Sequence, residues 1–331
     1  MTGKERIAAV LAGKKVDFAP RTPILMRYAA EHIGSNYGAF ASDHRVMVEA
    51  NLQCAKDFDF DQISTISDPY RETQGFGAEI QYVRDGVPRC LKHPLEEDND
   101  LSKLLAPDPL KSERMHDRVQ AVAAYAAMNS GYSILGWVEG PAAEAADLRN
   151  AEPFLVDLMI DEDYACELMD LTLENAIRFA QAQADAGCDM IGIGDAIASQ
   201  VSPAVYEALI QPREKRLVKA IQAMGVSVKM HICGNIAHLL PGLADVGPDV
   251  VDVDHMVSLA EARRIMPPAT VLTGNLDPVA MILNGTPAKI RDAVRAAYAE
   301  AGERYFVNAG CEIPSGTPVE NLKAMCEPVS L

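Results

Sequence analysis

The feature that most constrains the fold is a repeated alternation between short apolar runs and longer amphipathic stretches. Eight runs are rich in Val, Ile, Tyr or Phe and have the length of strands. They occupy residues 18–25, 62–67, 132–138, 190–195, 226–234, 249–254, 269–277 and 305–310. Between them, helical spacing is clear over residues 161–186 and 202–224, and a glycine follows each stretch. Eight strands alternating with helices predict a (β/α)8 TIM barrel.

One segment interrupts this alternation between the second and third apolar runs. Residues 78–95 are expected to form a hairpin that turns at Asp85 and Gly86, because Asp-Gly is a strong hairpin signal. A helix is expected from about residue 112 to residue 128. Since no low-complexity linker divides the chain, we expect a single barrel domain over residues 1–331 with a hairpin–helix insertion around residues 77–128.

The N-terminal sequence and the overall charge indicate a cytoplasmic protein without nucleic-acid or membrane partners. Thr2 and Glu5 have capping-box spacing before a helical pattern, and no secretory apolar segment is seen. The formal net charge of −17 opposes association with phosphate backbones and anionic lipid. The seven cysteines are an odd number spread along the chain, so a disulfide framework is not expected. A cysteine with a role is therefore a ligand or a nucleophile.

Polar residues follow the apolar runs at their C-terminal ends, where (β/α)8 barrels build their active sites. Four carboxylates are candidate catalytic residues, as proton donors or for positioning a substrate: Asp68, Glu139, Asp195 and Asp254. Four other residues are candidate substrate-binding groups: Arg27, Tyr70, His255 and Asn275. A carboxylate at a strand end also commonly caps the next helix or orients another ligand, so each of the four has a structural alternative.

His231 and Cys233 lie two residues apart at the end of the fifth run, so a strand directs both side chains to the same side. Cys311 follows the eighth run, and barrel closure can bring it towards the fifth. Three nitrogen and sulfur ligands with an open position are typical of a catalytic zinc site. His-x-Cys is a weak motif, and the alternative is that both cysteines are core thiols beside a hydrogen-bonded histidine.

Several segments together resemble a known family. "AGCDMIGIGDAIASQVSP", "HICGN", "DVVDVDHMVSLAEAR", "LTGNLDP" and "NAGCEIPSGTPVENLKAM" resemble the uroporphyrinogen decarboxylase superfamily, in order over nearly the whole chain. The decarboxylases carry two arginines near the N-terminus that handle the carboxylates of the porphyrinogen. This chain is similar at Arg27 but has Glu31 at the second position. The decarboxylases also have Gly-His-Gly after the eighth strand, where this chain has Cys311 and Glu312 after Gly310.

His231, Cys233 and Cys311 together resemble the zinc signature of the corrinoid-linked methyltransferase branch. That branch includes methylcobalamin:coenzyme M methyltransferases and some methyl-ether demethylases. The resemblance implies Zn²⁺ bound by these three residues and methylcobalamin carried by a separate corrinoid protein. Asp68 resembles the family's catalytic aspartate by position, whereas Glu312 departs from the small residue expected after the cysteine.

The expected function is zinc-dependent transfer of a methyl group between corrinoid cobalt and the sulfur or oxygen of a small thiol or methyl ether. Two thiolates neutralise the zinc and favour a thiol, and a methyl ether would need a proton donor. Glu139 is a candidate fourth ligand in the resting site. Two alternatives stay open: a decarboxylase-like lyase of a smaller acid, and a non-catalytic corrinoid- or tetrapyrrole-binding protein with a structural metal.

Overall fold

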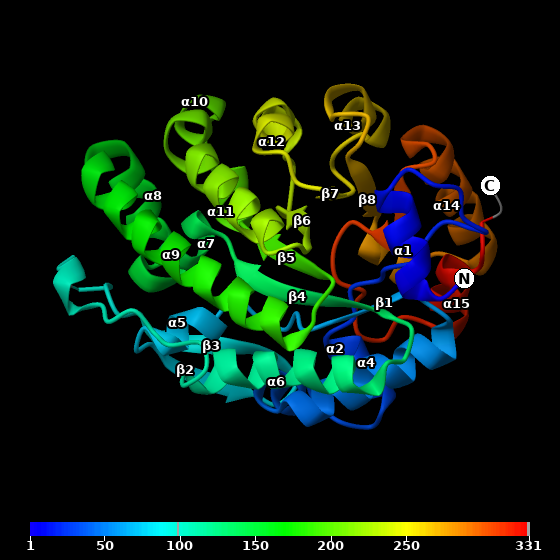
Figure 1. Ribbon diagram of the computed structural model, residues 1–331, viewed down its shortest axis with the longest axis horizontal. Coiled ribbons are helices and arrows are strands. Elements are labelled where there is room, and N and C mark those ends of the chain that lie inside the picture. Colours follow the sequence, from blue (N-terminus) through cyan, green and yellow to red (C-terminus); the bar gives the residue numbers. More distant parts are fainter. Residues whose placement is uncertain (98, 330–331) are drawn as a thin grey trace.

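The computed structural model describes residues 1–97 and 99–329, and its centre is a curled sheet of seven parallel strands (Figure 1). The strand order is β1-β4-β5-β6-β7-β8-β9, so each strand pairs with the next one along the chain. The strands are β1 (Gln62–Ser64), β4 (Ser133–Glu139), β5 (Met190–Gly194), β6 (Ser227–His231), β7 (Val250–Val253), β8 (Val271–Leu276) and β9 (Tyr305–Ala309). All seven fall on predicted apolar runs, which confirms that part of the alternation and the barrel class.

The first of the eight apolar runs lies between β9 and β1 but forms isolated bridges in place of a strand, one of them between Arg21 and Val307. The Val307 amide donates to the Pro20 carbonyl over 2.7 Å, and the Asp61 amide donates to the Arg21 carbonyl over 2.8 Å. Pro20 and Pro23 have no N–H group and cannot extend a ladder. The prediction of a regular strand was therefore wrong here, although the segment occupies the place that closes the barrel.

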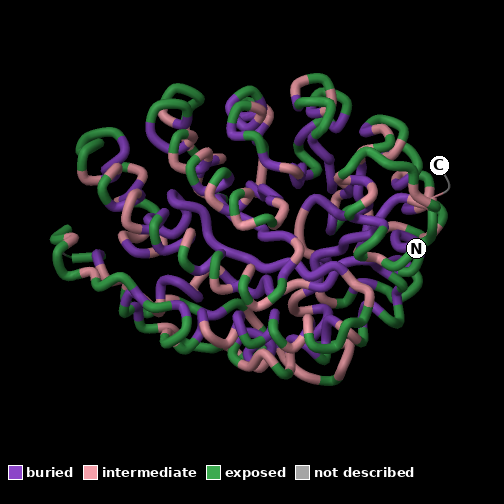
Figure 2. The backbone as a smooth tube through the Cα atoms, in the orientation of Figure 1, coloured by how far each residue is buried: buried purple, intermediate pink, exposed green. Residues whose placement is uncertain are grey.

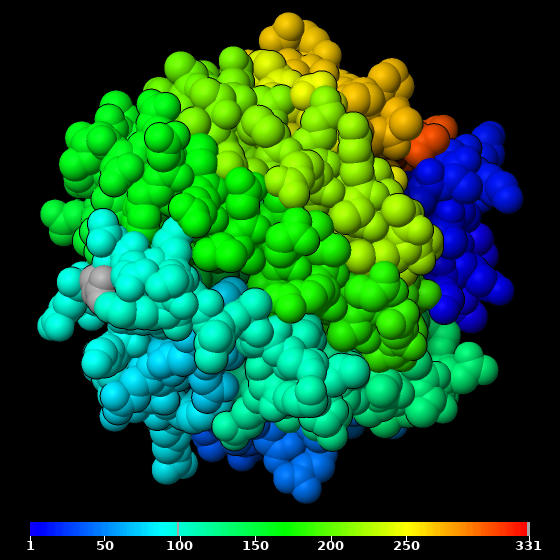
Figure 3. Space-filling view, turned by 60° about the vertical axis from the view of Figure 1, so that its left-hand side comes forward, coloured from blue at the N-terminus to red at the C-terminus, as the bar shows by residue number. Residues whose placement is uncertain are grey.

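Helices cover the outside of the sheet in sequence order, as successive bands of colour show on the surface (Figures 1 and 3). The longer helices are α1 (Gly3–Leu11), α4 (His44–Phe58), α6 (Glu113–Met128), α7 (Pro141–Arg149), α8 (Ala151–Ile160), α9 (Glu162–Ala186), α11 (Gln211–Ala223), α14 (Pro287–Ala301) and α15 (Val319–Cys326). The shorter helices are α2 (Arg27–His32), α3 (Tyr37–Ser42), α5 (Arg71–Gly75), α10 (Pro203–Val205), α12 (Leu240–Val246) and α13 (Leu259–Ile265). Single turns are η1 (Leu101–Lys103), η2 (Ala196–Gln200), η3 (Tyr206–Ile210), η4 (Ala237–Leu239) and η5 (Pro278–Leu283).

The helix boundaries follow the capping signals of the sequence. In α1 the Glu5 amide donates to the Thr2 hydroxyl and the Thr2 amide donates to the Glu5 carboxylate, which is the predicted capping box. Helix α9 ends at Gly187, whose φ of 106° favours glycine. The helix predicted over residues 202–224 is interrupted by the π turn η3, which directly precedes α11. The interruption is explained by Pro212, which has no N–H group for an α-helical hydrogen bond.

The hairpin predicted before α6 is present as β2 (Glu79–Val83) and β3 (Gly86–Lys92). Val83 pairs with Gly86, so the two loop residues are Arg84 and Asp85, one residue earlier than predicted. Helix α6 packs against α4, α9 and β4 as part of the outer layer. A single-domain organisation over residues 1–331 stays a prediction.

The strands at the centre of the barrel are largely buried (Figure 2). One cluster inside the barrel consists of buried side chains from several strands and from α1: Ile7, Val10, Leu135, Trp137, Met190, Val250, Val271 and Phe306. This packing leaves polar groups for the C-terminal ends of the strands. Across the two described ranges, the chain has no helix with the length and apolar character needed to cross a membrane.

Candidate metal centre

The register of the sheet brings one residue from each of four neighbouring strands to the same level near their C-terminal ends. Glu139 pairs with Gly194, Gly194 with His231, and His231 with Asp252. Residues paired in this way direct their side chains to the same face of the sheet. The layer therefore places Glu139, His231 and Asp252 inside the barrel, with a glycine between the first two.

The predicted ligands His231, Cys233 and Cys311 converge on one point. Their ligand atoms all lie within 4.8 Å of one another. Nε2 of His231 is 3.0 Å from Sγ of Cys233, and the two Sγ atoms are 3.9 Å apart. His231 ends β6 and Cys311 follows β9, so residues 80 positions apart along the chain meet because the barrel closes. One nitrogen and two sulfur donors in this arrangement fit Zn²⁺.

A glycine allows Cys311 to reach this position. A Cβ atom on Gly310 would lie 2.5 Å from the backbone nitrogen of His255, a distance that no side chain can occupy. The Gly310 amide also donates to the Leu276 carbonyl over 2.8 Å. The chain after β9 is thereby held against the loop after β7, and Cys311 projects towards β6.

The His231 ring is oriented by a buried network that sequence reasoning missed. Nδ1 of His231 lies 3.3 Å from the Asp252 carboxylate, and Nζ of Lys229 lies 2.7 Å from the same carboxylate. Asn308 donates to Asp252 over 3.4 Å. Burial lowers the pKa of His231, but the Asp252 carboxylate and Cys311 raise it to about 10. Asp252 thus fixes Nδ1 and leaves Nε2 facing the thiols.

The two thiols differ in acidity because they are close together. The hydrogen bond from Cys233, opposed by burial and supported by His231, lowers the pKa of Cys311 to about 4. The same hydrogen bond and burial raise the pKa of Cys233 well above its usual range. Cys311 is therefore a thiolate at neutral pH, the form in which cysteine binds a metal.

The three ligands line a cavity of about 210 Å³. Most of its other walls are apolar, from the side chains of Ile24, Met26, Ile66, Pro69, Val87, Trp137 and Ala196. Trp137 is the only tryptophan of the chain, and its ring centroid lies 6.2 Å from that of His231. The volume suits a small molecule or one end of a larger one.

Glu139 lines this cavity and is held by two donors. Nη2 of Arg71 lies 2.5 Å from its Oε1, and the Trp137 indole N–H donates to the same oxygen over 3.3 Å. Burial, opposed by Arg71 and supported by Glu72, raises the pKa of Glu139 to about 8. The carboxyl therefore carries a proton at neutral pH and is a candidate proton donor. Its oxygen is not part of the three-ligand cluster found among the described residues.

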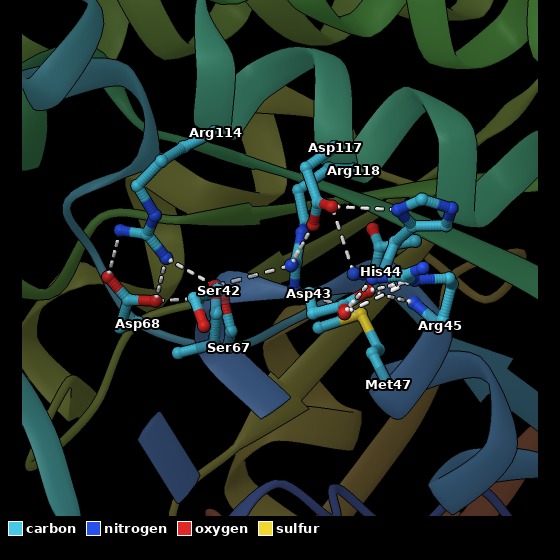
Figure 4. A network of polar contacts seen from close by, with 12 residues as sticks. Ser42, Asp43, His44, Arg45, Met47, Ser67, Asp68, Arg114, Asp117 and Arg118 are labelled. Atoms are coloured by element: carbon cyan, nitrogen blue, oxygen red, sulfur yellow. Dashed lines mark hydrogen bonds and ion pairs between the residues drawn. The ribbon is translucent and has the colours of Figure 1, made fainter. Parts of the chain in front are cut away.

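Asp68 also lines the cavity but is fully engaged by Arg114 (Figure 4). The two guanidinium nitrogens lie 2.6 and 2.5 Å from its two oxygens, and the Ser67 hydroxyl donates to it over 2.9 Å. Burial opposes ionisation, but Arg114 and Arg71 hold the pKa of Asp68 well below its usual range. Asp68 is therefore a fixed anion that can orient a substrate and cannot serve as an acid.

A second group of potential ligands, Asp43, His44 and Asp117, lies at the other end of the network in Figure 4. Arg45 donates to Asp43 over 2.7 Å, and Arg118 bonds Asp117. The His44 amide also donates to Asp117, over 2.9 Å. These carboxylates already have cationic partners, so the group joins α4 to α6 electrostatically and is not a metal site.

The other two candidate carboxylates hold the backbone in place. Asp195 is fully buried, does not line the cavity and accepts from the Ala143 amide over 2.6 Å at the start of α7. Asp254 accepts from the Gly234 amide over 2.8 Å, and its other oxygen lies 2.6 Å from Nδ1 of His255. Asp254 therefore fixes the loop that carries Cys233. Both contacts match the structural alternative, and a catalytic role for either stays a prediction.

The four candidate substrate-binding residues are not among those that line the cavity, and Asn275 lines a separate pocket. Arg27 binds Glu31 over 2.7 Å, and the Tyr70 amide donates to Asp68 over 3.1 Å. The Asn275 amide group donates to the carbonyls of Asp254 and Val257, and His255 is bonded to Asp254. Arg27 and His255 remain accessible at the mouth.

Two signals in the sequence could have revealed the missed network. Lys229 and Asp252 are charged residues within otherwise apolar strands, and each is almost completely buried. Charges in such positions are nearly always paired. Neighbouring parallel strands place them at adjacent levels, with Lys229 opposite Val250 and His231 opposite Asp252.

Comparisons with known proteins show which family the chain belongs to. Methylcobamide:CoM methyltransferase MtaA of Methanosarcina barkeri is 27% identical over 333 residues, which cover 98% of this chain and 96% of that protein. Methylcobamide:CoM methyltransferase MtbA of Methanosarcina mazei is 28% identical over 334 residues, covering 98% and 97%. A solved structure of a methyltransferase from Methanosarcina mazei has the same fold, with a TM-score of 0.90 at 24% identity over 98% of this chain and 97% of that chain. The model of the uroporphyrinogen decarboxylase (URO-D) family matches residues 2–330, and this chain belongs to that family.

Proposed function

We propose that this chain is a zinc-dependent methyltransferase that moves a methyl group between the cobalt of a corrinoid protein and the sulfur or oxygen of a small molecule. The convergence of His231, Cys233 and Cys311 within 4.8 Å at a cavity carries the proposal. The methylcobamide:CoM methyltransferases, which match 98% of the chain, support it.

His231, Cys233 and Cys311 would hold the metal, since their atoms are the nitrogen and sulfur donors that Zn²⁺ prefers. Bound zinc supplies Lewis acidity, which deprotonates a thiol or polarises an ether oxygen. Because the cavity lies directly beside these three residues, a small substrate can bring its sulfur or oxygen to the same point.

The chain's own residues perform the remaining tasks. Asp252 holds Nδ1 of His231 and thereby keeps Nε2 directed at the thiols. Glu139 carries a proton at neutral pH and can deliver it to an oxygen from which a methyl group departs. Asp68, fixed by Arg114, orients the substrate as a permanent anion. The apolar walls exclude water, which strengthens each of these interactions.

A separate corrinoid protein would present its cobalt at the barrel mouth. The mouth is the C-terminal end of the strands, where the cavity is lined by Val87 of the β2–β3 hairpin and by the loops after β6 and β9 that carry the proposed ligands. The net charge of −17 favours small molecules and a protein partner in the cytoplasm over nucleic acid or a membrane surface.

The geometry does not favour decarboxylation of a substrate with many carboxylates. Glu31, at the position where the decarboxylases carry their second arginine, binds Arg27 over 2.7 Å and accepts from the Ser315 hydroxyl over 2.5 Å. The arginine that remains is thus neutralised by its neighbour. We expect no coproporphyrinogen when the protein is supplied with uroporphyrinogen anaerobically.

Zinc content and methyl transfer test the proposal together. Elemental analysis of the folded protein should give about one zinc per chain, and Cys233→Ala and Cys311→Ala should each release it. Cys166→Ala is the matched control, because this half-buried cysteine lies in α9 away from the cluster and should leave the zinc in place.

Methyl transfer is measured from methylcobalamin to a thiol, by the change in corrinoid absorbance. Transfer should require zinc and should disappear in His231→Ala. Full zinc retention in both cysteine variants would exclude the site, and a zinc-loaded protein that never moves a methyl group would leave only the binding-protein alternative.

A further inference from the structure

The cavity beside the three ligands is poor in positive charge. Its lining includes three carboxyl groups, those of Asp68, Glu139 and Glu312, and a single guanidinium, that of Arg71. Arg71 is completely buried and already bonded to Glu139, and its Nε lies 3.5 Å from Glu72. Its guanidinium group is therefore already occupied by two carboxyl groups of the protein.

The neighbouring cations among the described residues are committed in the same way. Arg114 forms a bidentate pair with Asp68 from behind the cavity wall. Arg27, at the mouth, pairs with Glu31 over 2.7 Å. An anionic group of a ligand would have to displace a protein carboxylate from one of these arginines, at the cost of leaving that carboxylate without its partner.

Glu312 adds a carboxyl group to the cavity wall next to the three proposed ligands. It follows Cys311 directly, lines the cavity and accepts from the Arg27 backbone amide over 3.0 Å. It brings no positive charge in either protonation state. A sulfonate or carboxylate on a short substrate would lie close to this carboxyl group in an apolar surrounding, and would find no free cation there to pair with.

The remaining walls fit an uncharged body. Ile24, Ile66, Val87 and Trp137 surround the space next to the ligands, and all of them offer hydrocarbon or aromatic surface. Contact with these walls is favourable for any apolar group that is removed from water.

We propose that this cavity accepts an uncharged small thiol or methyl ether and excludes anionic thiols of the mercaptoethanesulfonate type. The proposal rests on the proposed function, because it concerns the same site and the same transferred group. It separates this chain from the methylcobamide:CoM methyltransferases that it resembles, whose names specify CoM.

Trp137 provides the measurement, because it is the only tryptophan and lines the cavity. Three thiols of equal chain length are titrated into the zinc-loaded full chain: 2-mercaptoethanol, 2-mercaptoethanesulfonate and cysteamine. Binding is followed by Trp137 fluorescence and, independently, by isothermal calorimetry. We expect 2-mercaptoethanol to bind more tightly than the sulfonate by about tenfold or more.

Glu312→Gln should reduce that ratio, since it replaces the carboxyl group by an uncharged amide that can donate hydrogen bonds and keeps the size of the side chain. Glu320→Gln, on the exposed first turn of α15, is the matched control and should leave the ratio unchanged. Equal or tighter binding of the sulfonate, tighter binding of cysteamine, or no binding of 2-mercaptoethanol in both measurements would overturn the proposal. Failure of the proposed function shows itself differently, as missing methyl transfer by the zinc-loaded chain, and the thiol preference of that chain can then still be measured.

Discussion

The Asp252 carboxylate lies 3.3 Å from Nδ1 of His231 and is itself completely buried. Its second partner, Lys229, is also buried and lies 2.7 Å away. Asp252 therefore takes part in a buried ion pair with Lys229 and also orients His231, a proposed metal ligand. Removing the charge of Asp252 should weaken both zinc binding and the stability of the fold, and these two effects can be measured separately.

Asp252→Asn should weaken zinc binding by about 10- to 100-fold, the usual effect of losing the carboxylate behind a histidine ligand. It should also lower the free energy of unfolding by about 3–5 kcal/mol, because Lys229 is left buried without its partner. The double variant Lys229→Met/Asp252→Asn should recover stability but not zinc affinity. Competition with a chelator and denaturant unfolding give the two values. Recovery of both properties in the double variant would show that Asp252 acts only through the fold.

Much of the barrel could be predicted because its strands are buried on both faces and therefore read as continuous apolar runs. The first run was the exception. Its two prolines remove N–H donors, and only the completed barrel shows that the Arg21 and Val307 backbones still meet. The position of a closing segment depends on strands that are far away in the sequence.

The convergence of His231, Cys233 and Cys311 could be predicted because His231 and Cys233 share a strand end and Cys311 follows the eighth apolar run. The family resemblance pointed to the same three residues. The partners of the candidate carboxylates could not be predicted from the sequence. Arg114 meets Asp68 from a helix 46 residues later, and Asp195 turns towards α7 and away from the cavity. Chain position places a carboxylate at the mouth, but only packing decides whether it faces a substrate, a guanidinium or an amide.

The buried Glu139 carboxyl should make stability depend on pH between about 4.5 and 8. Its pKa is raised in the folded state, so the folded protein holds a proton that the unfolded chain has released in this range. Stability should therefore fall as the pH rises. Glu139→Gln should make this fall shallower, because the amide is neutral at every pH. Thermal unfolding of both proteins at a series of pH values measures the difference, and parallel curves would contradict the assignment of the proton to Glu139.

Asp195 is expected to stabilise the protein without taking part in the reaction. Asp195→Ala removes the acceptor for the amides of Ala142 and Ala143 at the start of α7, which should cost about 0.5–2 kcal/mol of unfolding free energy. Zinc content and the Trp137 fluorescence titration should stay as in the unaltered protein. A loss of ligand binding in a variant that keeps its zinc would place Asp195 among the catalytic residues instead.

The pair of Asp68 and Arg114 should behave as one unit. Asp68→Asn leaves Arg114 buried without a charged partner, so the free energy of unfolding should fall by about 3–5 kcal/mol. Zinc should be retained, because Asp68 is not among the three ligands, while methyl transfer slows through loss of substrate orientation. Arg114→Met should cost a similar amount of stability, and the double variant Asp68→Asn/Arg114→Met should cost less than the two single changes added together.

Denaturant unfolding of the unaltered protein, the two single variants and the double variant measures the coupling energy between Asp68 and Arg114. The exposed pair of Arg291 and Glu327 serves as the control. That pair has equally short contacts but is open to water, so its coupling should be much smaller. Additive costs for Asp68 and Arg114 would mean that the bidentate contact contributes no more than a surface pair. The carboxylate would then be free to change partners when a substrate arrives, and it would no longer be the fixed anion on which its orienting role depends.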